Sequence, residues 1–260
     1  MIDTIIPDWP APAHVKGMFT TRHGGVSSGL HGTYATLNLG MHVNDHPGNV
    51  AINRALLRKH LPGDPQWLQQ VHGANHVWID QAGALPRDAA EDKQGDAALS
   101  RQYNTVCAIM VADCLPVFLC DTAGTTVGVV HAGWRGLATG VIEQSIAAMQ
   151  IESNQLMAWL GPAIGPDHFE VGDEVRTAFV SQDSHAARAF TSNRNSVEHA
   201  EIKWFANIFE LARQHLACAG VTRIYGGGIC TYSDPARFFS YRRDGETGRM
   251  AALIWLEKPA

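Results

Sequence analysis

The middle of the chain reads VCAIMV at residues 106–111, VFL at 117–119 and VGVV at 127–130. Within these runs, apolar residues do not alternate with polar ones. A strand with one face in water needs only every second residue to be apolar, so continuous apolar runs are typical of strands in a sheet covered on both sides. The three runs therefore predict buried strands at the centre of the fold.

Helices and further strands are expected around this centre. Apolar residues recur at helical spacing after Gly136 and from Ile202 to Leu216, with Gly220 as a stop signal. The elements interleave without strict βαβ regularity, which indicates an α+β or mixed-sheet α/β protein, and no linker divides the single domain expected over residues 1–260. The predicted helices are 48–63, 136–149 and 202–216, and the further strands are 74–79, 223–225 and 251–256.

The composition is that of an ordinary globular protein. Of 260 residues, 45% are hydrophobic and 17% are charged, unlike the charge-rich composition of disordered chains. The formal net charge is −5 without a run of like charges, so nucleic acid is not expected as a partner. Five scattered cysteines, no signal-peptide pattern and no apolar stretch of ~20 residues predict a soluble, cytoplasmic protein without a membrane partner.

Three candidate metal ligands follow or end apolar runs, at His72, Cys114 and His131. One thiolate and two imidazoles suit Zn²⁺ or copper better than Mg²⁺ or Ca²⁺. Three protein ligands would leave a coordination position open, as in catalytic zinc sites. Histidine and cysteine also serve as ordinary core or surface residues, so the spacing alone leaves a structural role open.

Other local motifs lack the context that their chemistry needs. The sequence GVSSG at 25–29 matches a serine nucleophile pattern but is followed by glycines and Asn38 instead of a helix. His168-Phe169-Glu170 matches half of a zinc deaminase signature, whose downstream cysteine pair is absent. Neither a phosphate loop nor a dinucleotide-binding glycine pattern occurs, so ATP or NAD is not expected.

Arginines beside glycine-rich segments are candidates for binding an anionic substrate. The guanidinium group binds phosphate or carboxylate through a planar fork of donors. Surface salt bridges are the open alternative. The arginines in question are Arg22, Arg135, Arg242 and Arg243.

Taken together, several segments resemble the YfiH family, the bacterial laccase-domain family also described as purine nucleoside phosphorylases. The resemblance runs from about residue 15 to the C-terminus, and the ADC, HAGWRG and SYRRD motifs are its most specific parts. The segments are TTRHGGVS at 20–27, LNLG at 37–40, QVHG at 70–73, ADCLPV at 112–117, HAGWRG at 131–136, GPAIG at 161–165, FSYRRD at 239–244 and TGRM at 247–250. Asn207 departs from the acidic residue expected in the helix after Lys203-Trp204.

The resemblance implies mixed β-sheets sandwiched between helices and a metal held by His72, Cys114 and His131. It also implies phosphorolysis of adenosine, inosine, guanosine and 5′-methylthioadenosine, with adenosine deamination as a second activity. Within the matching segments, we expect substrate contacts at Arg22, Asn38, Arg135 and Arg242.

Two other activities stay open. The older family name, polyphenol oxidase, implies copper, although reduction of O₂ by four electrons needs several copper sites and one candidate cluster is visible. A cysteine-type amidase that edits peptidoglycan precursors would use Cys114 as nucleophile and His131 or His72 as base. The sequence leaves open whether the protein is a monomer or a homodimer.

Overall fold

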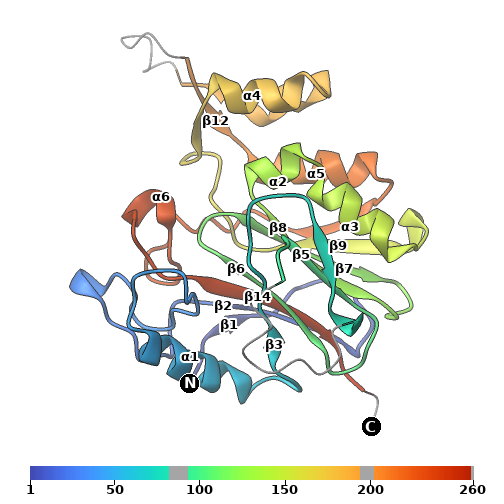
Figure 1. Cartoon of the computed structure of the whole chain (residues 1–260). Helices are drawn as coiled ribbons and strands as arrows, with labels where there is room; N and C mark the ends of the chain where they lie inside the picture. The colour runs from blue at the N-terminus through green and yellow to red at the C-terminus, as the bar shows by residue number, and fades with distance from the viewer. Residues whose placement is uncertain (82–92, 194–201, 259–260) are drawn as a thin grey trace.

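Two β-sheets lie face to face at the centre of the molecule (Figure 1), whose computed structural model describes residues 1–81, 93–193 and 202–258. The five-stranded sheet has the order β1 (Thr4–Ile5), β2 (Val15–Thr20), β14 (Met250–Leu256), β6 (Val106–Val111) and β3 (Pro65–Gln66). The six-stranded sheet has the order β13 (Arg223–Gly226), β9 (Leu156–Leu160), β7 (Leu115–Asp121), β8 (Val127–Ala132), β5 (Ala97–Ser100) and β4 (His76–Trp78).

Helices cover the outer face of each sheet (Figure 1). On the five-stranded sheet, Leu57 of α1 (Pro47–Arg58) packs in one cluster with Ala108 and Leu253. On the six-stranded sheet, α2 (Trp134–Ala138), α3 (Val141–Met149) and α5 (Ile208–Cys218) contribute to a second cluster. The order helix, sheet, sheet, helix confirms the predicted fold class of mixed sheets between helices.

The continuous apolar runs follow from this layering. In β6, Cys107 and Ile109 point into the core between the sheets, whereas Ala108 and Met110 point toward α1. Side chains alternate across a strand, so both sets must be apolar when both faces are buried. All three predicted runs are strands, but β6 belongs to one sheet and β7 and β8 belong to the other. The chain therefore crosses between the layers at residues 112–114.

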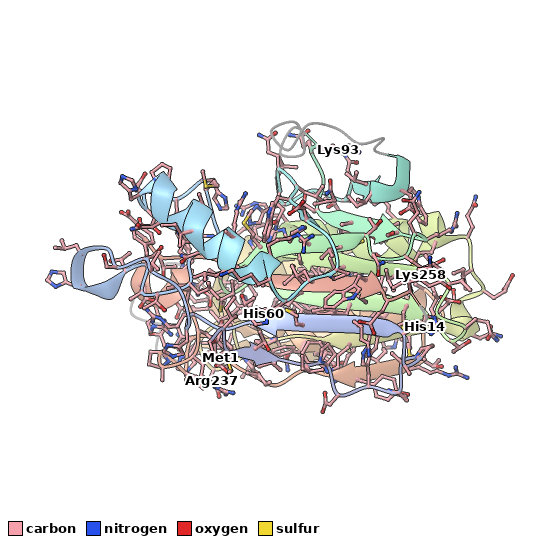
Figure 2. All side chains as sticks on the ribbon, turned by 90° about the horizontal axis from the view of Figure 1, so that it is seen from below. Met1, His14, His60, Lys93, Arg237 and Lys258 are labelled. Atoms are coloured by element: carbon pink, nitrogen blue, oxygen red, sulfur yellow. The ribbon has the colours of Figure 1, made fainter. Side chains whose placement is uncertain are left out.

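The two ends of the described chain meet the five-stranded sheet. β14 pairs antiparallel with β2, and the backbone N–H of Glu257 donates to the carbonyl of His14 at 2.7 Å. Figure 2, seen from below, shows Lys258 and His14 at the same edge of the molecule. Within the described residues, no helix is long and apolar enough to cross a membrane.

The helix predicted over 202–216 is partly wrong. Residues 203–206 form β12 (Lys203–Ala206), the middle strand of a small sheet with β10 (Glu170–Gly172) and β11 (Phe190–Ser192). This sheet and α4 (Asp173–Val180) lie beyond the helices that cover the six-stranded sheet (Figure 1). Helix α5 begins only after Asn207, whose side-chain oxygen accepts a hydrogen bond from the N–H of Glu210. Asn207 is thus the N-cap of α5 and does not lie inside a helix.

The helix predicted over 136–149 is divided in two. Gly140, with φ 84°, separates α2 from α3. Helix α1 begins where the sequence predicted it but ends at Arg58, before the expected limit at 63, and strands β4, β13 and β14 lie within about two residues of their predicted bounds. In the described part of the chain, the remaining elements are α6 (Tyr241–Asp244) and 3₁₀ turns at Leu30–Gly32, Ile79–Gln81, Ser153–Gln155 and Ser184–Ala189.

Candidate metal centre

The structure brings His72, Cys114 and His131 together at one end of the two sheets. Their ligand atoms all lie within 4.8 Å of one another, and Cys114 Sγ lies 3.8 Å from His72 Nε2. Cys114 directly precedes β7, where the chain has crossed from the other sheet, and His131 lies on the neighbouring strand β8. His72 comes from the loop between β3 and β4. Three segments distant in sequence thus meet at one point.

Buried Asp96 fixes two of these three groups. Its carboxylate accepts a hydrogen bond from His131 Nδ1 at 2.8 Å and from the backbone N–H of His72 at 2.9 Å. The N–H groups of Val71 and Gly73 donate to it as well. Because Nδ1 of His131 is engaged, Nε2 is the atom that this ring offers to a metal. A carboxylate behind a ligating histidine is typical of metal sites, where it orients the ring.

The backbone around the cluster takes conformations that most residues avoid. His72 has φ 58° and Asp113, next to Cys114, has φ 87°. Gly133 approaches so closely that a Cβ there would lie 3.1 Å from Cys114 Sγ and 3.2 Å from His72 Cδ2. The glycine of the HAG motif therefore leaves the space in which the thiol and the imidazole meet.

The charges of the cluster stabilise one another. Burial raises the pKa of the Cys114 thiol, but His131 and His72 lower it by more, so that it falls to about 6. Burial lowers the pKa of His131, but the Cys114 thiolate and the Asp96 carboxylate raise it by more, to about 9. Without a metal, these interactions favour a thiolate beside an imidazolium. A bound cation would take the place of the imidazolium proton.

The donor set fits a transition metal. A thiolate and two imidazoles match zinc or copper, and the cluster could hold either ion. Among the residues that the structure describes, no fourth His, Cys, Asp or Glu joins the group. A fourth coordination position would therefore be open to the adjoining cavity.

A cavity of about 890 Å³ adjoins the cluster and is lined by all three of its residues. Two arginines, Arg54 and Arg249, and the aromatic ring of Tyr241 also lie on its wall. The other lining residues are Met41, His42, Leu68, Gln69, Gln70, Met110, Val111 and Ala112.

Arg22 and Asn38, two of the predicted substrate contacts, are used inside the protein. The guanidinium of Arg22 donates to the carbonyl oxygens of Gly32, Ala35 and Pro235. Asn38 is fully buried, and its side-chain oxygen accepts from the backbone N–H of Arg249. Neither residue is part of the cavity lining, and their role as substrate contacts stays a prediction.

The other two predicted contacts also lie outside the cavity lining. The guanidinium of Arg135 packs over the ring of Trp134, 4.5 Å from its centroid. Arg242 donates to the carbonyl oxygens of His168 and Glu170. These two roles stay predictions as well. Asp96 and Arg249 were not predicted as site residues from the sequence. The signals that could have found them are an acidic residue directly before a strand, for Asp96, and the TGRM segment, for Arg249.

Comparison with known sequences reveals close relatives. The family model described as multi-copper polyphenol oxidoreductase laccase matches residues 16–257. A Pseudomonas aeruginosa protein named purine nucleoside phosphorylase is 47% identical over 253 residues, covering 97% of this chain and 98% of the relative. The Escherichia coli protein named purine nucleoside phosphorylase YfiH is 46% identical, covering 98% of this chain and 100% of the relative.

Solved structures show the same fold. A Neisseria meningitidis protein, 45% identical, superposes with a TM-score of 0.89 and covers 98% of this chain and 99% of its own. A Bacillus licheniformis protein titled YfiH, 29% identical, superposes with a TM-score of 0.84 and covers 94% of this chain and 93% of its own. The chain therefore belongs to the YfiH family, whose family model is described as multi-copper polyphenol oxidoreductase laccase.

Proposed function

We propose that the protein is a metal-dependent purine nucleoside phosphorylase. The proposed substrates are adenosine, inosine, guanosine and 5′-methylthioadenosine, with adenosine deamination as a second activity. The observation that carries this proposal is that one cavity contains both a His-Cys-His cluster and two arginines. The names of the relatives from Pseudomonas aeruginosa and Escherichia coli support it.

Phosphorolysis makes two demands on such a cavity. A phosphate oxygen must form a bond to C1′ of the nucleoside while the bond from C1′ to the base nitrogen breaks. The base leaves with the bonding electron pair and takes up a proton. The protein must therefore hold an anion beside the sugar and supply a proton to the base. Cationic side chains meet the first demand, and an imidazole meets the second.

The cavity offers groups for both demands. Arg54 and Arg249 provide positive charge, and His42 is an imidazole on the wall outside the triad. The volume of the cavity, about 890 Å³, lies in the usual range of small-molecule sites and suits a nucleoside together with phosphate. Tyr241 presents an aromatic ring of the kind against which a purine stacks.

The proposed metal is zinc, held by His72, Cys114 and His131, with copper as the alternative. When bound, zinc would supply a Lewis acid at the edge of the cavity. Asp96 would orient His131 toward the ion, and Gly133 would leave room for the ligands. All five cysteines are free thiols, which supports a cytoplasmic, reducing location for the protein.

The experiment that tests the proposal measures metal content and nucleoside cleavage in one preparation. Protein purified without chelator or added copper should carry about one zinc per chain. Inosine should then yield hypoxanthine and ribose 1-phosphate only when phosphate is present. Base release at the same rate without phosphate would indicate a hydrolase instead. Metal-free protein that is fully active would contradict the metal-dependent mechanism.

A cysteine-type amidase or hydrolase is the second candidate. One observation favours it: Cys114 is a thiol whose pKa is lowered to about 6 beside His131, as in nucleophilic cysteine–histidine pairs. Such an enzyme keeps its activity under exhaustive chelation and forms a covalent adduct at Cys114. The metalloenzyme loses its activity under the same treatment.

Oxidase activity, which the family description implies, is a third proposal. Reduction of O₂ to water takes four electrons and several copper ions. In residues 1–81, 93–193 and 202–258, the structure shows one group of three or more metal-binding side chains. A polyphenol assay on the copper-loaded protein, run beside the nucleoside assay, ranks the two activities.

A further inference from the structure

Arg249 lines the same cavity as the triad, and one edge of its guanidinium group is fixed. Its Nη1 donates to the carbonyl oxygens of Thr247, at 2.8 Å, and Gly248, at 3.1 Å. Within the described residues, its Nε and Nη2 make no hydrogen bond, and no carboxylate forms an ion pair with it. Nε and Nη2 form the edge that binds an oxyanion through two parallel hydrogen bonds. That edge is available to a ligand.

The surroundings of Arg249 favour an anionic ligand. The side chain is partly buried, and burial lowers the pKa of the guanidinium by more than the nearby Cys114 and Asp113 raise it. The group nevertheless stays charged at neutral pH. A partly buried cation without a contacting carboxylate is poorly solvated, so an anion that reaches it is bound more strongly than in water. The ring of Tyr241 lies 5.9 Å from the guanidinium carbon. Arg54, on the same wall, adds further positive charge to the cavity.

The LNLG segment at 37–40 is built around this arginine. Asn38 Oδ1 accepts from the N–H of Arg249 at 2.9 Å, and the N–H of Leu39 donates to the carbonyl of Arg249 at 3.1 Å. A Cβ on Gly40 would lie 2.8 Å from Arg249 Cγ, so the arginine stem passes where any other residue would place its side chain. Asn38 is itself held by a hydrogen bond from its Nδ2 to Asp45 at 3.0 Å.

We infer that Arg249 binds the phosphate co-substrate, and that Asn38 and Gly40 are positioning residues that fix its guanidinium at the cavity wall. This inference rests on the proposed phosphorolysis. It assigns the anion to Arg249 because Arg22 and Arg242 donate to carbonyl oxygens outside the cavity. Asn38 would then act by holding Arg249 in place and not by contacting the substrate directly.

The test compares Arg249→Lys with the matched variant Arg223→Lys. Arg223 is an exposed arginine at the start of β13 and does not line the cavity. Lysine keeps the charge at position 249 but loses the planar fork. Two quantities are measured: the dissociation constant of inorganic phosphate by calorimetry without nucleoside, and the KM values for phosphate and inosine. Zinc content and melting temperature are measured on every variant.

For Arg249→Lys we expect the dissociation constant and the KM for phosphate to rise about tenfold or more, because a charge-assisted fork is lost. The KM for inosine and the zinc content should stay close to wild type. Gly40→Ala should also raise the KM for phosphate, since the methyl group of the alanine displaces the stem of Arg249. Its kcat should change less than its KM. Arg223→Lys should match wild type in every measurement.

The outcomes separate this inference from the proposed function. Suppose that wild-type protein cleaves inosine with phosphate and that Arg249→Lys has the same KM for phosphate as wild type. This result overturns the role of Arg249 and leaves the proposed function standing. Phosphate binding that depends on Arg249, without cleavage of any nucleoside, overturns the proposed function and keeps the anion site. A wild type that neither binds phosphate nor cleaves nucleosides overturns both. An equal loss in Arg223→Lys shows that replacing any arginine by lysine weakens phosphate binding, and it also overturns the site.

Discussion

Asp96 connects two of the three predicted metal ligands through its buried carboxylate. In Asp96→Asn the side chain keeps one acceptor oxygen and gains an NH₂ group that faces donors. We expect zinc affinity to fall about 10–100-fold, since the ring of His131 is no longer held by a carboxylate. A competition titration against a chromophoric chelator measures this loss. Asp167→Asn, at an exposed position, is the control and should bind zinc like wild type. Unchanged affinity in Asp96→Asn would show that His131 is oriented by packing alone.

The same carboxylate should shape stability in acid. Burial raises the pKa of Asp96, but His131 and the N–H groups of Gly73 and Val71 lower it by more, so that its net pKa is depressed. A carboxyl with a depressed folded pKa stabilises the protein above its unfolded pKa of about 3.9, and that contribution is lost as the pH falls through the folded value. Urea titrations of metal-free protein should show a steeper loss of stability below about pH 4 in wild type than in Asp96→Asn. If the free energy of unfolding falls with pH equally in wild type and Asp96→Asn, the Asp96 carboxylate does not contribute to stability in this way.

Cys114 differs from the buried cysteines in a way that alkylation can measure. Burial raises the pKa of Cys107 and Cys120, so both should stay unmodified in the folded protein. Cys114, with a pKa of about 6, should react within minutes after chelation and slowly when zinc holds its sulfur. Mass spectrometry of the labelled peptides reads out each site, and exposed Cys218 serves as the positive control. Rapid labelling of Cys114 in zinc-loaded protein would favour the hydrolase.

At the scale of elements, the N-cap of α5 offers a test of the corrected helix boundary. Asn207 accepts from the N–H of Glu210 at 3.1 Å, so its loss leaves a donor of the first turn without a protein partner. Asn207→Ala should lower the free energy of unfolding by about 1 kcal/mol, whereas Asn207→Asp should keep it, since Asp caps equally well. Chemical denaturation of the two variants and wild type measures this. If the helix began at 202, position 207 would lie inside it, and Asn207→Ala would raise the free energy of unfolding because Ala has the higher helix propensity.

The same boundary shows which elements the sequence could predict. β6, β7 and β8 were predicted correctly because both of their faces are buried, which fills each run with apolar residues. Ile202 and Phe205 also matched a helical stripe that continues into α5, and so they were wrongly joined to it. The strand β12 is defined by its antiparallel pairing with β10 and β11, both of which lie outside the 202–216 stretch in which the helix was predicted. Local periodicity does not predict that pairing.

At the scale of the whole molecule, the limits of sequence reasoning have a similar cause. The triad was predicted from motifs at strand ends, and the structure brings its members within ligand distance. Asp96 was missed because its contact with His131 depends on the pairing of β5 with β8. Arg249 was missed because the LNLG segment that holds it lies about two hundred residues earlier in the chain. Strand pairing decides the first contact, and hydrogen bonds between a loop and the residue before β14 decide the second. Both contacts join segments far apart in the sequence, so no local pattern predicts them.

Metal removal should lower the stability of the whole fold, because the triad joins both strands β7 and β8 to the loop before β4. The unfolded chain does not hold these three ligands together, so the metal binds the folded state far more tightly than the unfolded state and thereby stabilises the fold. At a free concentration 100 times its dissociation constant, zinc should add about 2.7 kcal/mol. For a chain of this size, that gain corresponds to a rise of roughly 5–11 °C in Tm.

Thermal denaturation with chelator, and after zinc is restored, measures this shift in wild type and in Cys114→Ser. The variant should gain little, since the hydroxyl of serine is a far weaker zinc ligand than a thiolate. An equal gain in both proteins would place the stabilising zinc elsewhere in the molecule. No gain in either would mean that the three side chains meet without binding zinc, and that Cys114 acts as a thiolate in its own right.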